Sequence, residues 1–140
     1  MHCFGSLMAN TMAGKPFECA LNPRMAHEHR YGELKRDIGK HKVLIVGGGP
    51  AGMMAAHTLA LRGSDVTLYE KADCLGGAIN LAKVPPLKER MQWLTDFYEY
   101  EFKRLGVTVC LNKEANAQDI EAAGADAVII ACLLYTSRCV

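Results

Sequence analysis

The sequence predicts an α/β fold, a partial doubly wound parallel sheet of the Rossmann-like type preceded by a loop-rich N-terminal linker segment. Two observations carry this prediction. A short apolar run, residues 43–46, leads directly into the glycine-rich residues 47–52, as a buried strand leads into a tight turn. Helical spacing follows the glycines, and strand-like and helix-like segments then alternate up to residue 131. Strands that alternate with helices form parallel sheets with helices on both faces.

The first elements are predicted in chain order. The run 43–46 is the first strand. The next helix begins at Pro50, which suits a first helical turn, and stops at Gly63. Residues 65–69 form the second strand, which ends at Glu70. The first unit is therefore β-α-β.

A second crossover and a last strand complete the pattern. Residues 72–86 are expected to form a long irregular connection, and the apolar positions within 87–105 mark one face of a helix. Residues 107–111 are the next strand. A short helix with Asn116 as its N-cap then leads to the last strand, 127–131.

Composition fits one modest globular domain and limits the classes of partner. The 140 residues are 50% hydrophobic and 22% charged, which excludes a wholly disordered chain. The net charge of +1 gives no strong field to attract nucleic acid or an anionic membrane surface. The longest apolar run, 127–135, has nine residues, against the roughly 20 of a transmembrane helix. We therefore expect a small-molecule partner, with no nucleic acid and no membrane.

The N-terminal residues 1–40 differ from the rest. They show no sustained helical or strand period, so they are predicted to form a loop-rich linker that packs on something else. No basic cluster followed by an apolar stretch occurs there, so a secretory signal is not supported. Without that signal, six cysteines at open spacings indicate cytosolic thiols or cluster ligands. The predicted compartment is the cytoplasm.

The glycine-rich hexapeptide predicts a dinucleotide site. Gly47, Gly49 and Gly52 satisfy G-x-G-x-x-G between a strand and a helix, and Glu70 lies eighteen residues after Gly52, where a ribose-binding carboxylate is needed. Gly47 permits the turn, Gly49 lets a pyrophosphate approach the backbone, and Gly52 lets the helix pack closely. The helix that starts at Pro50 presents N–H groups to the phosphates. The plainer alternative is a tight turn followed by a solvated acid at a strand end.

The acid also limits the choice of nucleotide. Glu70 can accept hydrogen bonds from ribose hydroxyls but would repel a 2′-phosphate, so the first nucleotide is not expected to be NADP. The strand, the loop and the carboxylate serve NAD and FAD alike, and the residues by themselves leave that choice open.

Residues 41–86 resemble the FAD-binding segment of the NADH:flavin oxidoreductases related to 2,4-dienoyl-CoA reductase and trimethylamine dehydrogenase, an old-yellow-enzyme-like family. In this family Leu-Gly-Gly follows the acid, here Leu75-Gly76-Gly77, and its backbone also lies against the dinucleotide. Upstream, residues 14–23 resemble the segment that joins the family's catalytic barrel to this domain. The resemblance covers roughly residues 12–131 and implies an incomplete FAD/NAD(P)-binding domain over 41–131, followed by a non-matching tail, 132–140.

The resemblance implies which residues hold the cofactors. Cys19 would be the last of four thiolates on a [4Fe–4S] cluster and Cys3 the preceding one, since soft thiolates suit such clusters. Fifteen residues separate the two cysteines, more than the family's usual spacing, and two thiolates cannot complete a four-iron site. No catalytic residue is assigned to this chain. The FAD-contacting set is Gly47, Gly49, Pro50, Ala51, Gly52, Glu70, Lys71, Leu75, Gly76 and Gly77.

The resemblance also implies a longer enzyme. Family members carry an FMN-containing barrel before this region, and an NAD(P)H domain and the second half of the FAD domain after it, none of which is in this chain. Electrons would pass from NAD(P)H through FAD and the cluster to FMN and then to an enoate or enoyl thioester. The alternative is a stand-alone dinucleotide-binding module or electron-transfer subunit. An NAD-dependent dehydrogenase would need a substrate domain for which 140 residues leave no room.

Overall fold

The computed structural model describes residues 4–19, 22 and 24–132. It divides the chain into two compact units, residues 1–35 and 36–140. Residues 36–40, which the sequence predicts in the linker, belong with the second unit. There, Asp37 accepts hydrogen bonds from the Ser64 hydroxyl at 2.8 Å and from the backbone N–H of His41 at 3.2 Å. The Ser64 hydrogen bond is the largest cause that lowers the pKa of Asp37 from 3.8 to about 2.

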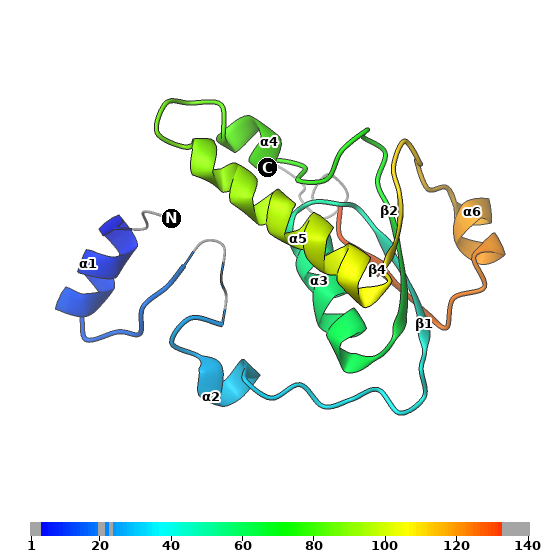
Figure 1. Ribbon diagram of the computed structural model, residues 1–140, viewed down its shortest axis with the longest axis horizontal. Coiled ribbons are helices and arrows are strands. Elements are labelled where there is room, and N and C mark those ends of the chain that lie inside the picture. Colours follow the sequence, from blue (N-terminus) through cyan, green and yellow to red (C-terminus); the bar gives the residue numbers. More distant parts are fainter. Residues whose placement is uncertain (1–3, 20–21, 23, 133–140) are drawn as a thin grey trace, which may run out of the picture. The chain divides into compact units, whose positions relative to one another are not determined.

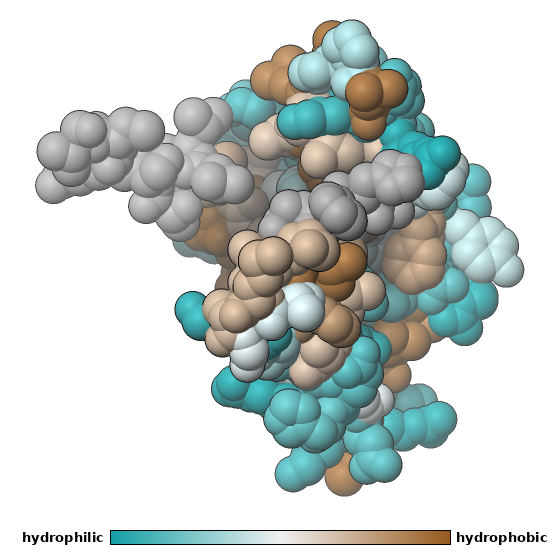
Figure 2. Space-filling view, turned by 90° about the vertical axis from the view of Figure 1, so that its left-hand side faces the viewer, coloured by the Kyte–Doolittle hydropathy of each residue, from teal (hydrophilic) through white to brown (hydrophobic). Residues whose placement is uncertain are grey.

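The first unit contains helices α1 (Phe4–Met12) and α2 (Glu28–Tyr31). The sequence predicts no helix there, and that expectation is wrong. Leucine, methionine and alanine in α1 favour a helix. Leu7, Met8 and Met12 are all exposed, so α1 lacks the buried apolar stripe whose regular spacing normally reveals a helix in a sequence. Figure 2 shows hydrophobic residues, in tan to brown, exposed among hydrophilic ones on the face that it draws.

The second unit has the predicted α/β order, with one further helix. The predicted connection 72–86 contains α4. The predicted helix 87–105 begins at Gln92, after a 3₁₀ turn, and Leu87, with a positive φ of 69°, lies outside it. The elements are β1 (Lys42–Val46), α3 (Pro50–Arg62), β2 (Asp65–Tyr69), α4 (Ile79–Ala82), the 3₁₀ turn η1 (Glu89–Met91), α5 (Gln92–Leu105), β3 (Thr108–Cys110), α6 (Ala117–Ala122) and β4 (Ala127–Ile130).

The four strands form one parallel sheet in the order β3-β2-β1-β4. Ile45 of β1 pairs in register with Leu68 of β2 and with Ile129 of β4. Figure 1 shows α3 and α5 on one side of this sheet and α6 on the other, as right-handed crossovers in two directions require. The Rossmann-like fold class is therefore confirmed.

The core lies between the sheet and the two helices α3 and α5. Helix α3 packs on β1 and β2, and α5 packs on α3. Phe102 of α5, Met53 of α3 and Leu68 of β2 are almost fully buried. Both helices end at a glycine in the left-handed conformation, Gly63 and Gly106, as the sequence predicts. No helix in the part of the chain that the structure describes is long and apolar enough to cross a membrane.

Candidate dinucleotide site

The glycine loop lies where the strand order of the sheet reverses direction. From β1 the chain moves to β2 and β3 on one side, whereas β4 lies on the other side of β1. A Cβ atom added to Gly47, directly after β1, would lie 2.9 Å from the carbonyl oxygen of Ala131, directly after β4. In doubly wound sheets the carboxyl ends of the strands at this reversal form the ligand crevice. The topology therefore places the loop at the expected binding position.

Two glycines of the loop are required by the protein's own packing. Gly47 has a φ of +111°, which few residues other than glycine adopt. A Cβ on Gly52, in the first turn of α3, would lie 1.8 Å from the carbonyl oxygen of Gly47. A side chain at either position would displace the backbone, because both clashes are with main-chain atoms.

The carboxylate of Glu70 ties the glycine loop to the end of β2. Its Oε2 accepts the N–H of Gly48 at 2.6 Å and its Oε1 accepts the N–H of Ala72 at 2.8 Å. The residue is only 8% exposed, so it is not the solvated strand end of the plainer alternative. An ionised carboxylate has about four lone-pair sites. Glu70 can therefore hold the loop and still accept hydrogen bonds from a ribose.

Gly48 is a site residue to which the sequence analysis gave no role. Besides donating to Glu70, it has no room for a side chain, since an added Cβ would lie 2.7 Å from Cδ2 of Leu75. The sequence did carry a signal for Gly48, because it is the middle one of three consecutive glycines, and the G-x-G-x-x-G motif requires only the first and the third of them.

Gly49 differs from its neighbours, because neither its backbone conformation nor the packing of the described residues requires a glycine there. Its φ of −74° and ψ of −177° are accessible to any residue. Beyond its chain neighbours, no heavy atom of the described residues lies within 4 Å of the place where its Cβ would be. Gly49 is also the N-cap of α3, and a helix N-terminus leaves its first N–H groups without intrahelical acceptors. The missing side chain leaves space beside a cluster of donors that suits a pyrophosphate.

A second glycine loop, Leu75-Gly76-Gly77, closes on the first. The N–H of Gly76 donates to the carbonyl oxygen of Gly48 at 2.9 Å. A Cβ on Gly77 would lie 3.1 Å from the Cα of Gly49. Leu75 is buried against the first loop. Two segments that lie about thirty residues apart in sequence thus form one cradle that consists mostly of backbone.

The other predicted contact residues surround this cradle. Pro50 is the first residue of α3, and Ala51 follows it with an exposed side chain. Lys71 is exposed next to Glu70. Cys74 is exposed before Leu75, and a hydrogen bond with Asp73 raises the pKa of its thiol. A thiol whose pKa is raised is a poor nucleophile.

The structure describes only one of the two predicted cluster ligands, so their pairing stays a prediction. Cys19 is a half-buried free thiol in the first unit, and Cys3 lies outside the described residues. In the described ranges 4–19, 22 and 24–132, no three side chains of histidine, cysteine, aspartate or glutamate gather as a possible metal site. The rings of His27 and His29 lie 6.5 Å apart, without a further ligand of that kind.

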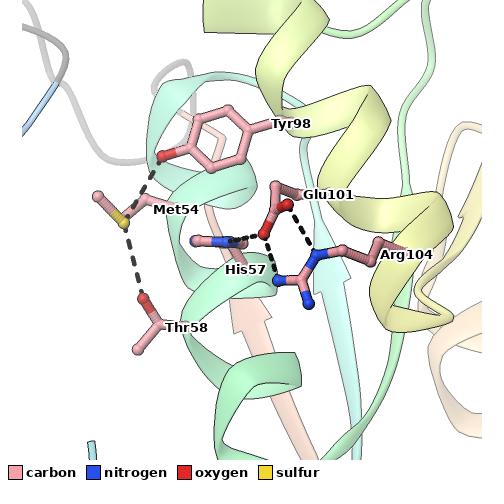
Figure 3. A network of polar contacts seen from close by, with 6 residues as sticks. All are labelled: Met54, His57, Thr58, Tyr98, Glu101 and Arg104. Carbon is pink, nitrogen blue, oxygen red and sulfur yellow. Dashed lines mark hydrogen bonds and ion pairs between the residues drawn. The ribbon is translucent and has the colours of Figure 1, made fainter. Parts of the chain in front are cut away.

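A polar cluster away from the cradle joins α3 to α5 (Figure 3). The Nε2 atom of His57 lies 3.0 Å from Oε2 of Glu101, and Nε and Nη2 of Arg104 donate to that carboxylate at 2.8 and 2.7 Å. The hydrogen bonds from Arg104 first, and from His57 second, lower the pKa of Glu101 from 4.5 to about 2. His57 is therefore a packed helix residue with an anionic partner.

The fold and the two facing glycine loops together define a Rossmann-like dinucleotide-binding domain. In agreement, the protein family described as "NAD(P)-binding Rossmann-like domain" matches residues 45–104.

Similarity to known proteins narrows this class. The chain is 45% identical over 113 residues to the NADH oxidase of Thermoanaerobacter brockii, and the aligned region covers 81% of this chain and 17% of that protein. It is 47% identical over 113 residues to the cinnamate reductase of Clostridium sporogenes, with the same two shares. The solved structure of 2-naphthoyl-CoA reductase with 2-naphthoyl-CoA matches with a TM-score of 0.82 and 35% identity, over 87% of this chain and 19% of that chain.

These matches confirm the resemblance that the sequence shows. The chain belongs to the family of NADH:flavin oxidoreductases related to 2,4-dienoyl-CoA reductase and trimethylamine dehydrogenase. It spans less than a fifth of the length of the relatives that it matches.

Proposed function

We propose that this chain holds the FAD of an NAD(P)H-dependent flavin oxidoreductase. The observation that carries the proposal is Gly49, whose backbone conformation admits any residue and whose Cβ position has no heavy atom of the described residues, other than its chain neighbours, within 4 Å. A bound pyrophosphate gives this position a reason to lack a side chain. Membership of the flavin oxidoreductase family supports a flavin, and the name of one relative, NADH oxidase, supports an electron transfer that begins at a nicotinamide.

The chain's own residues would bind and orient the dinucleotide. The N–H groups at the start of α3 and in the second glycine loop would face the pyrophosphate, and Glu70 would accept hydrogen bonds from the ribose. Pro50, Ala51 and Lys71 would lie along the same ligand. FAD, when bound, supplies the hydride and electron chemistry, while the protein supplies position and electrostatics.

The activity of the complete enzyme is a further part of the proposal. We infer a reductase of C=C bonds in an unsaturated acid or thioester, in line with the names cinnamate reductase and 2-naphthoyl-CoA reductase. As the resemblance implies, other parts of that enzyme would hold FMN in a barrel, and Cys19 with Cys3 would contribute to a [4Fe–4S] cluster. The described residues of this chain offer no group for the chemistry on the substrate.

Substitution of Gly49 tests the FAD site. Gly49→Val should abolish most FAD binding, because the branched side chain would occupy the place of the pyrophosphate. It should lower the melting temperature of the apoprotein only by the weaker N-cap preference of valine, since no heavy atom of the described residues other than the chain neighbours lies within 4 Å of the Cβ position. The measurements are a fluorescence titration with FAD and a melting curve without it. Equal FAD affinity for the variant and the wild type would show that the loop is misassigned.

Glu70→Ala should weaken FAD binding by roughly 1.5–3 kcal/mol, the range for hydrogen bonds to a charged group. Because the carboxylate also accepts the Gly48 N–H, part of this loss would come from a loosened loop. The cofactor itself is identified by denaturing the purified full-length enzyme and analysing the flavins that it releases. Recovery of FMN alone would contradict the proposal.

A further inference from the structure

The second glycine loop is held from behind by the side chains of α4 and α5. A Cβ on Gly76 would lie 2.8 Å from Oδ1 and 2.9 Å from Nδ2 of Asn80, and 2.9 Å from Cγ2 of Thr95. Thr95 is 1% exposed. The backbone of Gly76, which has a φ of +115°, therefore lies directly on a side-chain amide and a buried methyl group.

A chain of hydrogen bonds runs from this loop into the first turn of α5. Nδ2 of Asn80 donates to the carbonyl oxygen of Leu75 at 2.9 Å. Nζ of Lys83 donates to Oδ1 of Asn80 at 3.1 Å and also to Oε1 of Gln92. Nε2 of Gln92 donates to Oγ1 of Thr95 at 3.0 Å and to a carboxylate oxygen of Asp96 at 2.9 Å. The loop is thus tied through two amides and one ammonium to the long helix.

The orientation of both amides follows from the charged groups in this chain. The ammonium of Lys83 has donors and no acceptor, so the oxygen atoms of Asn80 and Gln92 must face it. The amide nitrogen of Asn80 then faces the Leu75 carbonyl, and that of Gln92 faces Asp96. Each of the three side chains donates to at least one acceptor in the series, and such linked hydrogen bonds make a local structure rigid.

The loop needs such support because its own residues offer little. Gly76 and Gly77 both have positive φ, +115° and +51°, and glycine has the largest backbone freedom to lose on ordering. Yet Gly76 must donate to Gly48, and Gly77 must approach Gly49, for the cradle to close. A binding site gains affinity when its donors are ordered before the ligand arrives.

We propose that Asn80, Lys83 and Gln92 form a positioning relay that orders the Leu75-Gly76-Gly77 backbone, and that Asn80 is thereby a positioning residue for the dinucleotide. The ordering of the loop is a property of the protein without ligand. Its consequence for FAD rests on the proposed function.

Two substitutions of Asn80 separate hydrogen bonding from the filling of space. Asn80→Asp keeps the shape and the oxygen that receives Lys83, but it cannot donate to Leu75 when ionised. Asn80→Leu removes the donor without adding a charge. Matched changes at Gln118, an exposed residue of α6, are Gln118→Glu and Gln118→Leu. Lys83→Met breaks the relay one step further away, with Lys88→Met at an exposed lysine as its control.

The first measurement is amide hydrogen exchange of the 140-residue chain without FAD, with NMR used to detect the exchange of each amide. We expect both Asn80 variants and Lys83→Met to raise the exchange rates of the Gly76, Ile79 and Asn80 amides about tenfold, the size expected from one lost hydrogen bond. The amides of β1 and all control variants should keep wild-type rates. Wild-type exchange at Gly76 in Asn80→Asp would overturn the relay, because a residue that only fills space is preserved by that change.

The second measurement is an FAD titration of the same substitutions in the full-length enzyme after its flavins have been removed, which keeps the two proposals distinguishable. Asn80→Leu should raise the FAD dissociation constant about tenfold, and Gln118→Leu should not change it. Faster exchange in the Asn80 variants, with no FAD binding by any protein, would support the relay and contradict the proposed FAD site. Wild-type affinity and wild-type exchange in both Asn80 variants would contradict the relay and leave the FAD site standing. If Asn80→Leu fails to fold, Lys83→Met decides, since it leaves Asn80 in place.

Discussion

Strands β1 and β4 are neighbours with similar apolar sequences and opposite environments. In β1, Leu44 and Ile45 point to opposite faces of the sheet and are 1% and 0% exposed. In β4, Ile129 and Ile130 also point to opposite faces, but they are 36% and 56% exposed. Both sequences are typical of buried parallel strands. The difference shows that burial depends on what lies beside a strand, and not on the strand's own residues.

The structure supplies the neighbours of β1 and few of those of β4. β1 lies between β2 and β4, and α3 covers one of its faces. β4 forms one edge of the sheet that the described residues build. An exposed apolar edge strand presents unpaired backbone groups and invites pairing with another chain. The contrast between the two strands therefore predicts where this chain is stable and where it associates.

The largest expected effect is in the buried strand. Ile45→Ala should lower the free energy of unfolding by about 2–5 kcal/mol, because it removes buried methyl groups and leaves a cavity. Ile130→Ala, the matched change in β4, should stay within about 0.5 kcal/mol of wild type, as exposed substitutions do. Urea unfolding of residues 1–140 measures both. Equal losses would show that β4 is as well packed as β1.

A smaller effect comes from acid, through the cluster that holds α5 on α3. Folding lowers the pKa of Glu101 from 4.5 to about 2, so its stabilising contribution is complete above pH 4.5 and is lost as the pH falls toward 2. Glu101→Gln should reduce the urea midpoint at pH 7, and its difference from wild type should shrink between pH 4.5 and pH 3. Glu99→Gln, at an exposed position of α5, is the control.

The stability of the wild type must be compared with that of Glu101→Gln at each pH, because other carboxylates of the chain also become protonated in acid. The pKa values of Asp37 and Asp119 are also lowered on folding, and both groups lose stabilising contacts in acid. A wild-type minus variant difference that stays constant from pH 7 to pH 3 would show that Glu101 does not stabilise the packing of α5 on α3.

The smallest effect on stability, with a clear effect on association, is expected at the exposed edge. Residues 1–140 should form concentration-dependent oligomers and bind FAD weakly. The Ile130→Lys variant should have a lower mean mass in solution than the wild-type chain. Its free energy of unfolding should differ from that of the wild type by about 0.5 kcal/mol or less. Thr108→Lys, which adds the same charge on β3 at the opposite edge, is the control. Sedimentation velocity gives the masses. A wild-type monomer that unfolds cooperatively and binds FAD at micromolar concentration or tighter would favour a stand-alone module.

Much of the second unit could be predicted from the sequence, because its signals are local. A strand followed by G-x-G-x-x-G and a helix has one common structural solution, and Gly63 and Gly106 mark the helix ends through their own backbone preference. The capping box of α6, in which Asn116 accepts the N–H of Asp119, is likewise local. The resemblance to the flavin oxidoreductases then pointed to the second glycine loop, for which no local signal exists.

Other features were decided only by the tertiary structure, because they depend on residues far apart in the sequence. The second role of Glu70 needs the N–H of Gly48, twenty-two residues away. The relay behind Gly76 needs α4, which at four residues is too short to show a period. The sequence by itself determined the first glycine loop and its acid. The tertiary structure decided which glycine of the loop the packing of the described residues does not require, and which of two similar strands is buried, because clashes and burial are properties of neighbours.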